Sequence, residues 1–219
     1  MAHPSPGTWV EIQGLVSAKQ LNGLVGCVTG PSNDAGRIPV EIDTQSQGKL
    51  VKAENMKVLE EGELTKVVRL HARGERDGGV RSQVYFPRKH SLFADPSATT
   101  CVVPSMAGVP LALKKCSPLS ALSERAHFDC QWATWLMIEP VSGLAPPEWQ
   151  SYVGPVLVFR PGGLDLSVAD VDLIMDWLDW LLELYPDTDD VMVRFLNPPA
   201  FERFKAKNLR DGRSLDLNI

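Results

Sequence analysis

The chain has 219 residues, of which 44% are hydrophobic and 22% are charged, and this composition is typical of a folded globular protein with a core. The formal net charge is −5, which argues against a general nucleic-acid binder, because such proteins usually carry a strongly basic domain. The four cysteines form no C-x-x-C pair, so the usual zinc-finger spacing is excluded.

The N-terminal residues, MAHPSPGTWVEIQ, have neither the basic start nor the apolar run of a secretory signal. No stretch of the sequence approaches the roughly 18 consecutive apolar residues of a membrane-spanning helix. Isolated cysteines are most often small buried hydrophobic residues. These features predict a cytoplasmic or nuclear protein that is not attached to a membrane.

Five short strand candidates follow one another between residues 7 and 59, separated by turn signals such as Asn22-Gly23. Several short strands in so short a segment favour a small barrel, since closure removes exposed sheet edges. We therefore predict a β-barrel over residues 1–62. The expected strands are Trp9–Ile12, Leu24–Val28, Arg37–Ile42, Lys49–Lys52 and Met56–Leu59.

Several residues of this segment form a pattern that is found in a known family of small barrels. It includes Val10 and Ile12, the turn Leu21-Asn22-Gly23, the pair Gly36-Arg37 and the run Val51-Lys52-Ala53-Glu54-Asn55. This pattern resembles SH3-like barrel repeats of the KOW and Tudor kind. The resemblance implies an SH3-like fold, but it leaves the function open because this barrel serves many roles.

The aromatic content of the segment limits what the barrel binds. A methyl-lysine cage and a proline-rich peptide groove both need several aromatic side chains. Between Gly7 and Leu59 the one aromatic residue is Trp9, and strand alternation is expected to turn it into the barrel. Both ligand classes are therefore disfavoured, and a barrel that only packs on its neighbour remains an alternative.

Residues 63–90 are expected to form a basic connector. From Leu64 to His90 there are seven basic and two acidic residues, with short strand candidates at Val67–Leu70 and Val84–Phe86. Basic side chains on an exposed segment attract acidic partners or phosphates. The candidate partner-binding residues in this connector are Arg73, Arg76 and Arg81.

Residues 91–219 are predicted to form an α+β domain with a mixed sheet and one long amphipathic helix. The helix is expected at Val168–Tyr185, with Ser167 as its cap and Asp170 completing a capping box. A strand on either side of the helix would give a right-handed crossover. The expected strands are Val109–Leu113, Gln131–Glu139, Val153–Arg160 and Val191–Leu196. The whole chain is thus predicted to be α+β.

The long helix has an apolar arc that is wider than a single sheet face requires. Two adjacent apolar stripes run along it, and the second includes Trp177 and Trp180. Either the helix is covered on two sides within the fold, or these tryptophans contact a partner, where Trp is a favoured residue. Both interpretations stay open from the sequence, and both tryptophans are candidate partner-binding residues.

A second resemblance covers residues 133–140, 143–150, 153–154 and 158–160. The sequences ATWLMIEP and GLAPPEWQ, with Val153-Gly154 and Val158-Phe159-Arg160, resemble a domain of uncharacterised function in fungal and algal proteins. Some of those proteins also carry MYND-type zinc fingers. This chain lacks the finger cysteines, so a role of the finger in those proteins is not implied here.

Motifs for catalysis are missing from the sequence: there is no phosphate loop, no G-x-S-x-G and no H-E-x-x-H. A nucleophilic Cys130 with His127 as its base is conceivable, but it needs spatial proximity. We predict no catalytic, cofactor-binding or metal-binding residues and no cofactor. The favoured function is a non-enzymatic protein-interaction or adaptor module. The alternatives are an enzyme whose site is assembled from scattered residues, and weak RNA binding through the barrel and the connector.

Overall fold

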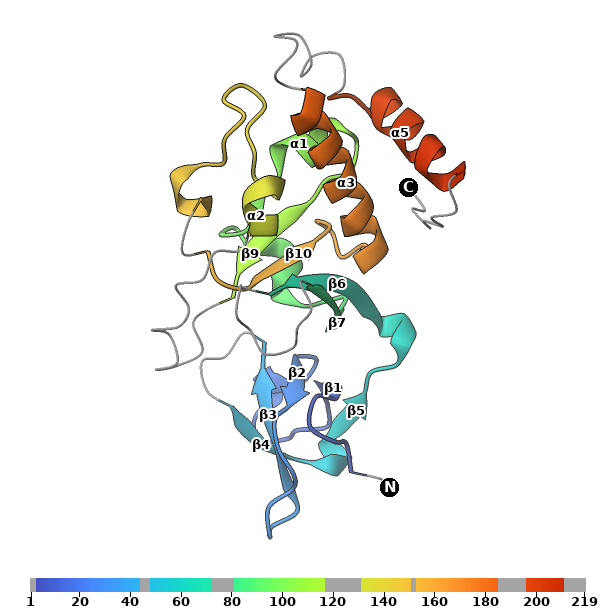
Figure 1. Cartoon of the computed structure of the whole chain (residues 1–219). Helices are drawn as coiled ribbons and strands as arrows, with labels where there is room; N and C mark the ends of the chain where they lie inside the picture. Colours follow the sequence, from blue (N-terminus) through green and yellow to red (C-terminus); the bar gives the residue numbers. More distant parts are fainter. Residues whose placement is uncertain are drawn as a thin grey trace. The chain divides into compact units, whose positions relative to one another are not determined.

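The structure is a computed structural model, and it describes residues 3–43, 48–71, 81–116, 131–150, 153–184 and 196–210. Packing divides the chain into two compact units (Figure 1). The first unit comprises Met1–Thr65 and Tyr85–Asp95, so the chain leaves this unit and returns to it. The second unit comprises Lys66–Val84 and Pro96–Ile219.

The first sheet has the strand order β4-β3-β2-β1-β5, and all its described pairings are antiparallel. It curls into half a barrel (Figure 1). The strands are β1 (Trp9–Ile12), β2 (Val25–Val28), β3 (Arg37–Ile42), β4 (Lys49–Lys52) and β5 (Met56–Val58). The 3₁₀ helices among the described residues up to Thr65 are η1 (Lys19–Leu21), η2 (Ala53–Asn55) and η3 (Glu61–Glu63).

The inner face of this sheet carries the core of the first unit. Alternate residues of β1 and β3, such as Val10 and Val40, are fully buried. Gly26 of β2 faces β3 so closely that a Cβ there would lie 2.6 Å from Val40 Cγ1 and 2.7 Å from the Glu41 carbonyl oxygen. A residue without a side chain is thus required for the two strands to approach at this point.

The second sheet has the strand order β7-β6-β10-β9-β8. Its strands are β6 (Leu64–Leu70), β7 (Arg81–Pro87), β8 (Thr99–Thr100), β9 (Ala112–Lys115) and β10 (Val156–Phe159). The pairings described for β6, β8, β9 and β10 are all antiparallel. The predicted mixed sheet is therefore wrong for these pairings. The strand expected at 191–196 lies, except for Leu196, outside the described residues, as does the crossover that it would complete.

In the described part of the second unit, the helices are α1 (Val102–Met106), α2 (Gln131–Leu136), α3 (Val168–Leu184) and α5 (Pro198–Arg210). Helix α5 packs against α3. The 3₁₀ helix η6 (Pro147–Trp149) precedes β10. Another 3₁₀ helix, η4 (Ser91–Ala94), belongs to the first unit. Two antiparallel sheets with these helices place the chain in the α+β class, as predicted. In the part of the chain that the structure describes, no helix is both long and apolar enough to cross a bilayer.

The segment QWATWL forms α2, and the strand predicted for Gln131–Glu139 is wrong. The reason is the period of its buried residues: Ala133 and Leu136 are fully buried and three positions apart, as on one helix face. Trp132 and Trp135 pack beside them against the same core. A short run of bulky residues fits both periods, and packing against α3 selects the helix here.

The capping box predicted for α3 is confirmed. The Ser167 hydroxyl accepts a hydrogen bond from the Asp170 amide at 3.1 Å, and the Asp170 carboxylate accepts one from the Ser167 amide at 2.7 Å. Both bonds satisfy amides that have no partner within the first helical turn. The helix therefore begins at the expected residue.

Candidate functional site

The two tryptophans of α3 have different environments. Trp177 is 0% exposed, and its ring meets that of Phe201 in α5 edge to face, with centroids 5.1 Å apart. Trp180 is half-buried beside Phe204, with centroids 5.5 Å apart. Helix α5 thus provides the second cover that the wide apolar arc needs. Solvent does not reach Trp177, so the alternative in which this side chain contacts a partner does not fit the structure.

The arginine candidates of the connector are only partly described. Arg73 and Arg76 lie outside the described residues. Arg81 begins β7, forms an ion pair with Asp172 of α3, and holds its guanidinium 5.0 Å from the centroid of the Trp132 ring. Its charge is therefore engaged inside the second unit, which corrects the expectation of an exposed basic side chain at this position.

A cluster of three rings on the first unit was not predicted from the sequence. Val10 and Ile12 occupy the inner face of β1, so Trp9 projects from the outer face. The expectation that Trp9 turns into the barrel is therefore wrong. Phe86 and His90 come from the returning segment 85–95 and pack against Trp9. The ring centroids lie 5.5 Å apart for Trp9–Phe86 and 5.4 Å apart for Trp9–His90.

The three rings do not form a cage for a methylated lysine. Phe86 and His90 complete the cluster with centroids 4.8 Å apart and ring planes at 80°. In a cage, a cation lies over the faces of several rings, and the rings must leave space for it between them. Rings in mutual edge contact fill that space with each other. The cluster is therefore a packing contact between β1 and the returning segment.

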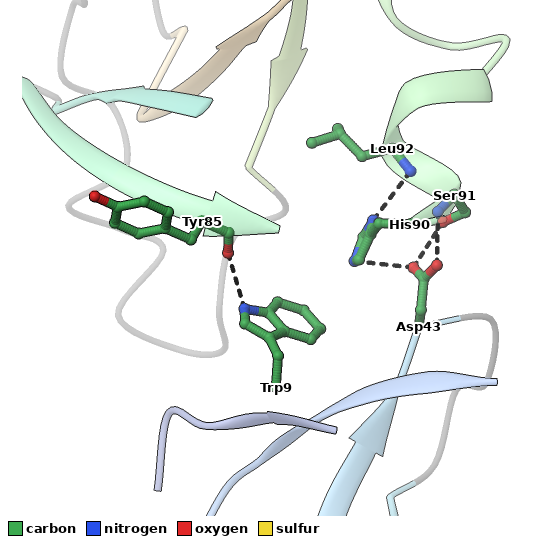
Figure 2. Close-up of polar contacts among 6 residues, drawn as sticks. All are labelled: Trp9, Asp43, Tyr85, His90, Ser91 and Leu92. Atoms are coloured by element: carbon green, nitrogen blue, oxygen red, sulfur yellow. Dashed lines mark hydrogen bonds and ion pairs between the residues drawn. The ribbon is translucent and has the colours of Figure 1, made fainter. Parts of the chain in front are cut away.

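A histidine–aspartate pair lies beside the rings (Figure 2). His90 Nε2 is 3.1 Å from Asp43 Oδ1, while His90 Nδ1 accepts a hydrogen bond of 3.1 Å from the Leu92 amide. Nδ1 therefore carries the lone pair and Nε2 carries the proton in the neutral ring. Asp43 also accepts hydrogen bonds of 2.6 Å from both the amide and the hydroxyl of Ser91.

The surroundings favour the neutral imidazole. Burial lowers the pKa of His90, and the nearby Asp43 carboxylate opposes this only in part. Both ring nitrogens already have partners, so no lone pair is free to accept a proton from a substrate. The Ser91 hydroxyl donates to Asp43 and not to His90. These three residues consequently lack the nucleophile–base contact that activates a serine.

We call Trp9, Asp43, Phe86, His90 and Ser91 the clasp, because they fasten residues 85–95 to the first sheet. Hydrogen bonds to a charged carboxylate contribute about 1.5–3 kcal/mol each. The contact is extended by an ion pair of 3.8 Å between Lys89 and Glu11 and by the Arg88 amide, which donates to the Glu63 carbonyl at 3.0 Å.

The thiols of Cys101 and Cys27 are not activated. Burial raises the pKa of Cys101 far above its usual value, and burial followed by the charge of Glu41 raises the pKa of Cys27. Cys130 and His127 lie outside the described residues. In the described segments, no three His, Cys, Asp or Glu side chains gather as metal ligands.

A second feature of the first unit is the outer face of β3 and β4. Arg37 lies directly opposite Lys52, and Pro39 lies opposite Leu50, whose side chain is 52% exposed. We call these four residues the β3–β4 patch. Lys52 reaches Glu54 at 3.3 Å, and Arg37 Nη1 donates to the Leu50 carbonyl at 3.3 Å. The patch combines an exposed leucine, which lies opposite a half-buried proline, with two neighbouring cations.

Comparisons with protein-family models, with curated proteins and with solved structures found no match to this chain.

Proposed function

We propose that this chain is a non-enzymatic protein-interaction module whose first unit is an SH3-like barrel of the KOW or Tudor kind. Two features support the barrel: the strand order β4-β3-β2-β1-β5, and the 3₁₀ helix η2 between β4 and β5. In this proposal the β3–β4 patch contacts the partner. The clasp holds the returning segment against the sheet and takes no part in chemistry.

The cross-strand pair Arg37–Lys52 carries the proposal. Like charges directly opposite each other in a sheet are destabilising, and this pair lies next to Leu50, which exposes half of an apolar side chain. Lys52 already has the Glu54 carboxylate at 3.3 Å, so a partner that brings carboxylates to this pair of cations, Arg37 above all, and an apolar residue to Leu50 relieves the costs that remain. The patch therefore fits a protein segment in which a hydrophobic residue is flanked by Asp or Glu.

Leu50 distinguishes this partner from a nucleic acid. Phosphates would satisfy Arg37 and Lys52, but an exposed leucine adds nothing to phosphate binding. Lysines on the edge strand β4 also disfavour the addition of another strand there, since charged edges oppose such pairing. Side-chain contacts across the outer face are therefore the proposed mode of binding.

Fluorescence anisotropy with the full chain tests the proposal. One labelled peptide has a central Leu flanked by Glu, and a second has the same Leu flanked by Lys. We expect the acidic peptide to bind with a Kd on the order of 10–100 μM, typical of a weak transient contact. Adding salt to about 0.5 M should weaken binding, because the Debye length falls to roughly 4 Å.

Substitutions in the patch then locate the contact. Leu50→Glu, and separately Arg37→Glu with Lys52→Glu, should each weaken binding about tenfold, equivalent to 1.4 kcal/mol. Val16→Glu is the matched control, because Val16 is 81% exposed and lies outside the patch. Circular dichroism checks that each variant is folded. Equal binding by wild type and Leu50→Glu would overturn the proposal. Binding of a short RNA in place of the peptide would favour the nucleic-acid alternative.

A further inference from the structure

The clasp contains a titratable group whose protonation state determines one hydrogen bond of the returning segment. We propose that His90 is a pH sensor of the first unit: its neutral ring holds η4 in place, and its protonation loosens residues 85–95. This inference concerns regulation and does not depend on the β3–β4 patch.

The geometry at Nδ1 explains the sensitivity. His90 precedes η4 as its N-cap, and its ring nitrogen accepts the hydrogen bond of the Leu92 amide at 3.1 Å (Figure 2). An added proton at Nδ1 makes this nitrogen a donor, so two N–H groups then face each other. The amide of Leu92 loses its acceptor, and the first turn of η4 loses its cap.

Among the described residues, few charged groups lie near His90. From the end of β3, Asp43 faces Nε2. From β1, Glu11 lies on the outer face but pairs with Lys89, which precedes His90 in the chain. The rings of Trp9 and Phe86, which cover the imidazole, are uncharged.

Asp43 does not cancel the effect of protonation. Its carboxylate accepts from Ser91 as well as from His90, and its bond to Nε2 is present in both protonation states. When the buried ring becomes cationic, it gains attraction to Asp43. The charge lacks the hydration that it would have in water, and the hydrogen bond from the Leu92 amide is lost. Burial is the larger influence and lowers the pKa of His90, which agrees with a clasp built for the neutral ring.

The direction in which pH changes the stability of the first unit follows from proton linkage. With the folded pKa below the unfolded value of about 6.5, the unfolded state binds more protons between the two values. The stabilisation by His90 is then complete above about pH 6.5 and is lost as the pH falls toward the folded pKa. Acidification, not alkalinisation, is expected to loosen the clasp.

Amide hydrogen exchange of the full chain at pH 7.5 and pH 5.0, corrected for intrinsic rates, tests the inference. We expect protection of residues 85–95 to fall on acidification by up to about tenfold for each unit separating the two pKa values. In His90→Asn the amide side chain keeps an acceptor for Leu92 and does not titrate. This variant should show little change between the two pH values.

His71→Asn is the matched control. His71 also has a hydrogen-bonded ring, 2.9 Å from the Ser82 hydroxyl, but it belongs to the second unit. This variant should keep the pH dependence of residues 85–95. An NMR titration of the Leu92 amide in the wild type provides a second readout if His90→Asn does not fold. Equal protection of wild-type residues 85–95 at both pH values, or an unchanged fall in folded His90→Asn, would overturn the inference.

Discussion

The indole nitrogen of Trp9 donates a hydrogen bond of 2.8 Å to the backbone carbonyl of Tyr85, 76 residues later in the chain. This bond ties the first strand of the first unit to the segment that returns to it. The ring contacts with Phe86 and His90 lie beside it. Trp9 therefore contributes to the clasp through both its ring and its N–H group.

Substitution of Trp9 separates these two contributions. Trp9→Phe keeps an aromatic ring but loses the hydrogen bond, so it should destabilise the first unit by about 1 kcal/mol. Trp9→Ala loses the packing as well and should cost about 3 kcal/mol. Urea unfolding measures the loss of stability in each variant, and amide exchange measures the protection of residues 85–95. Equal losses in the two variants would mean that the hydrogen bond is the only important contact of this side chain.

Gly26 provides a test of the packing between β2 and β3. The Cβ of Gly26→Ala would clash with Val40 and with the Glu41 carbonyl, and a backbone atom cannot move away cheaply. We expect a loss of about 1–3 kcal/mol in the free energy of unfolding. Gly62→Ala is the control, because nothing lies within 4 Å of the added Cβ and the backbone is not in the left-handed region. Thermal unfolding of the two variants compares them directly.

The strands of the first sheet were predictable because their signals are local. Alternation and a turn dipeptide such as Asn22-Gly23 lie within a few residues of each strand that they define. The face of Trp9 was not predictable in the same way. Alternation shows that Trp9 and Val10 point in opposite directions, but only the returning segment makes the outer face a favourable place for an indole.

The candidate site was beyond sequence reasoning because its members are distant in the chain. Asp43 and Ser91 are 48 positions apart, and neither lies in a recognisable motif. The helix α3 shows the opposite case, since its period and capping box are local signals. The wide apolar arc of α3 allowed the interpretation that this helix is packed on two sides within the fold. The sequence did not identify α5 as the element on the second side.

Trp177 and Trp180 should respond differently to truncation. Trp177 is fully buried against Phe201, so Trp177→Ala should cost about 3–5 kcal/mol and reduce the folded fraction of the second unit. Trp180 is half-buried, so Trp180→Ala should cost less, about 1–2 kcal/mol. Chemical denaturation of both variants gives the comparison. A folded Trp177→Ala variant of wild-type stability would contradict the core position of this ring.

The pair Arg81–Asp172 should show a small, measurable coupling energy. Both side chains are partly exposed, 25% for Arg81 and 35% for Asp172, so water screens their attraction. A double-mutant cycle with Arg81→Ala and Asp172→Ala should give about 0.5–1 kcal/mol, decreasing with added salt. Arg81→Lys keeps the charge but loses the planar group that lies over Trp132, so it should recover only part of the loss. If Arg81→Lys matches the wild type in stability, the stacking on Trp132 contributes nothing, and the ion pair alone explains the position of this residue.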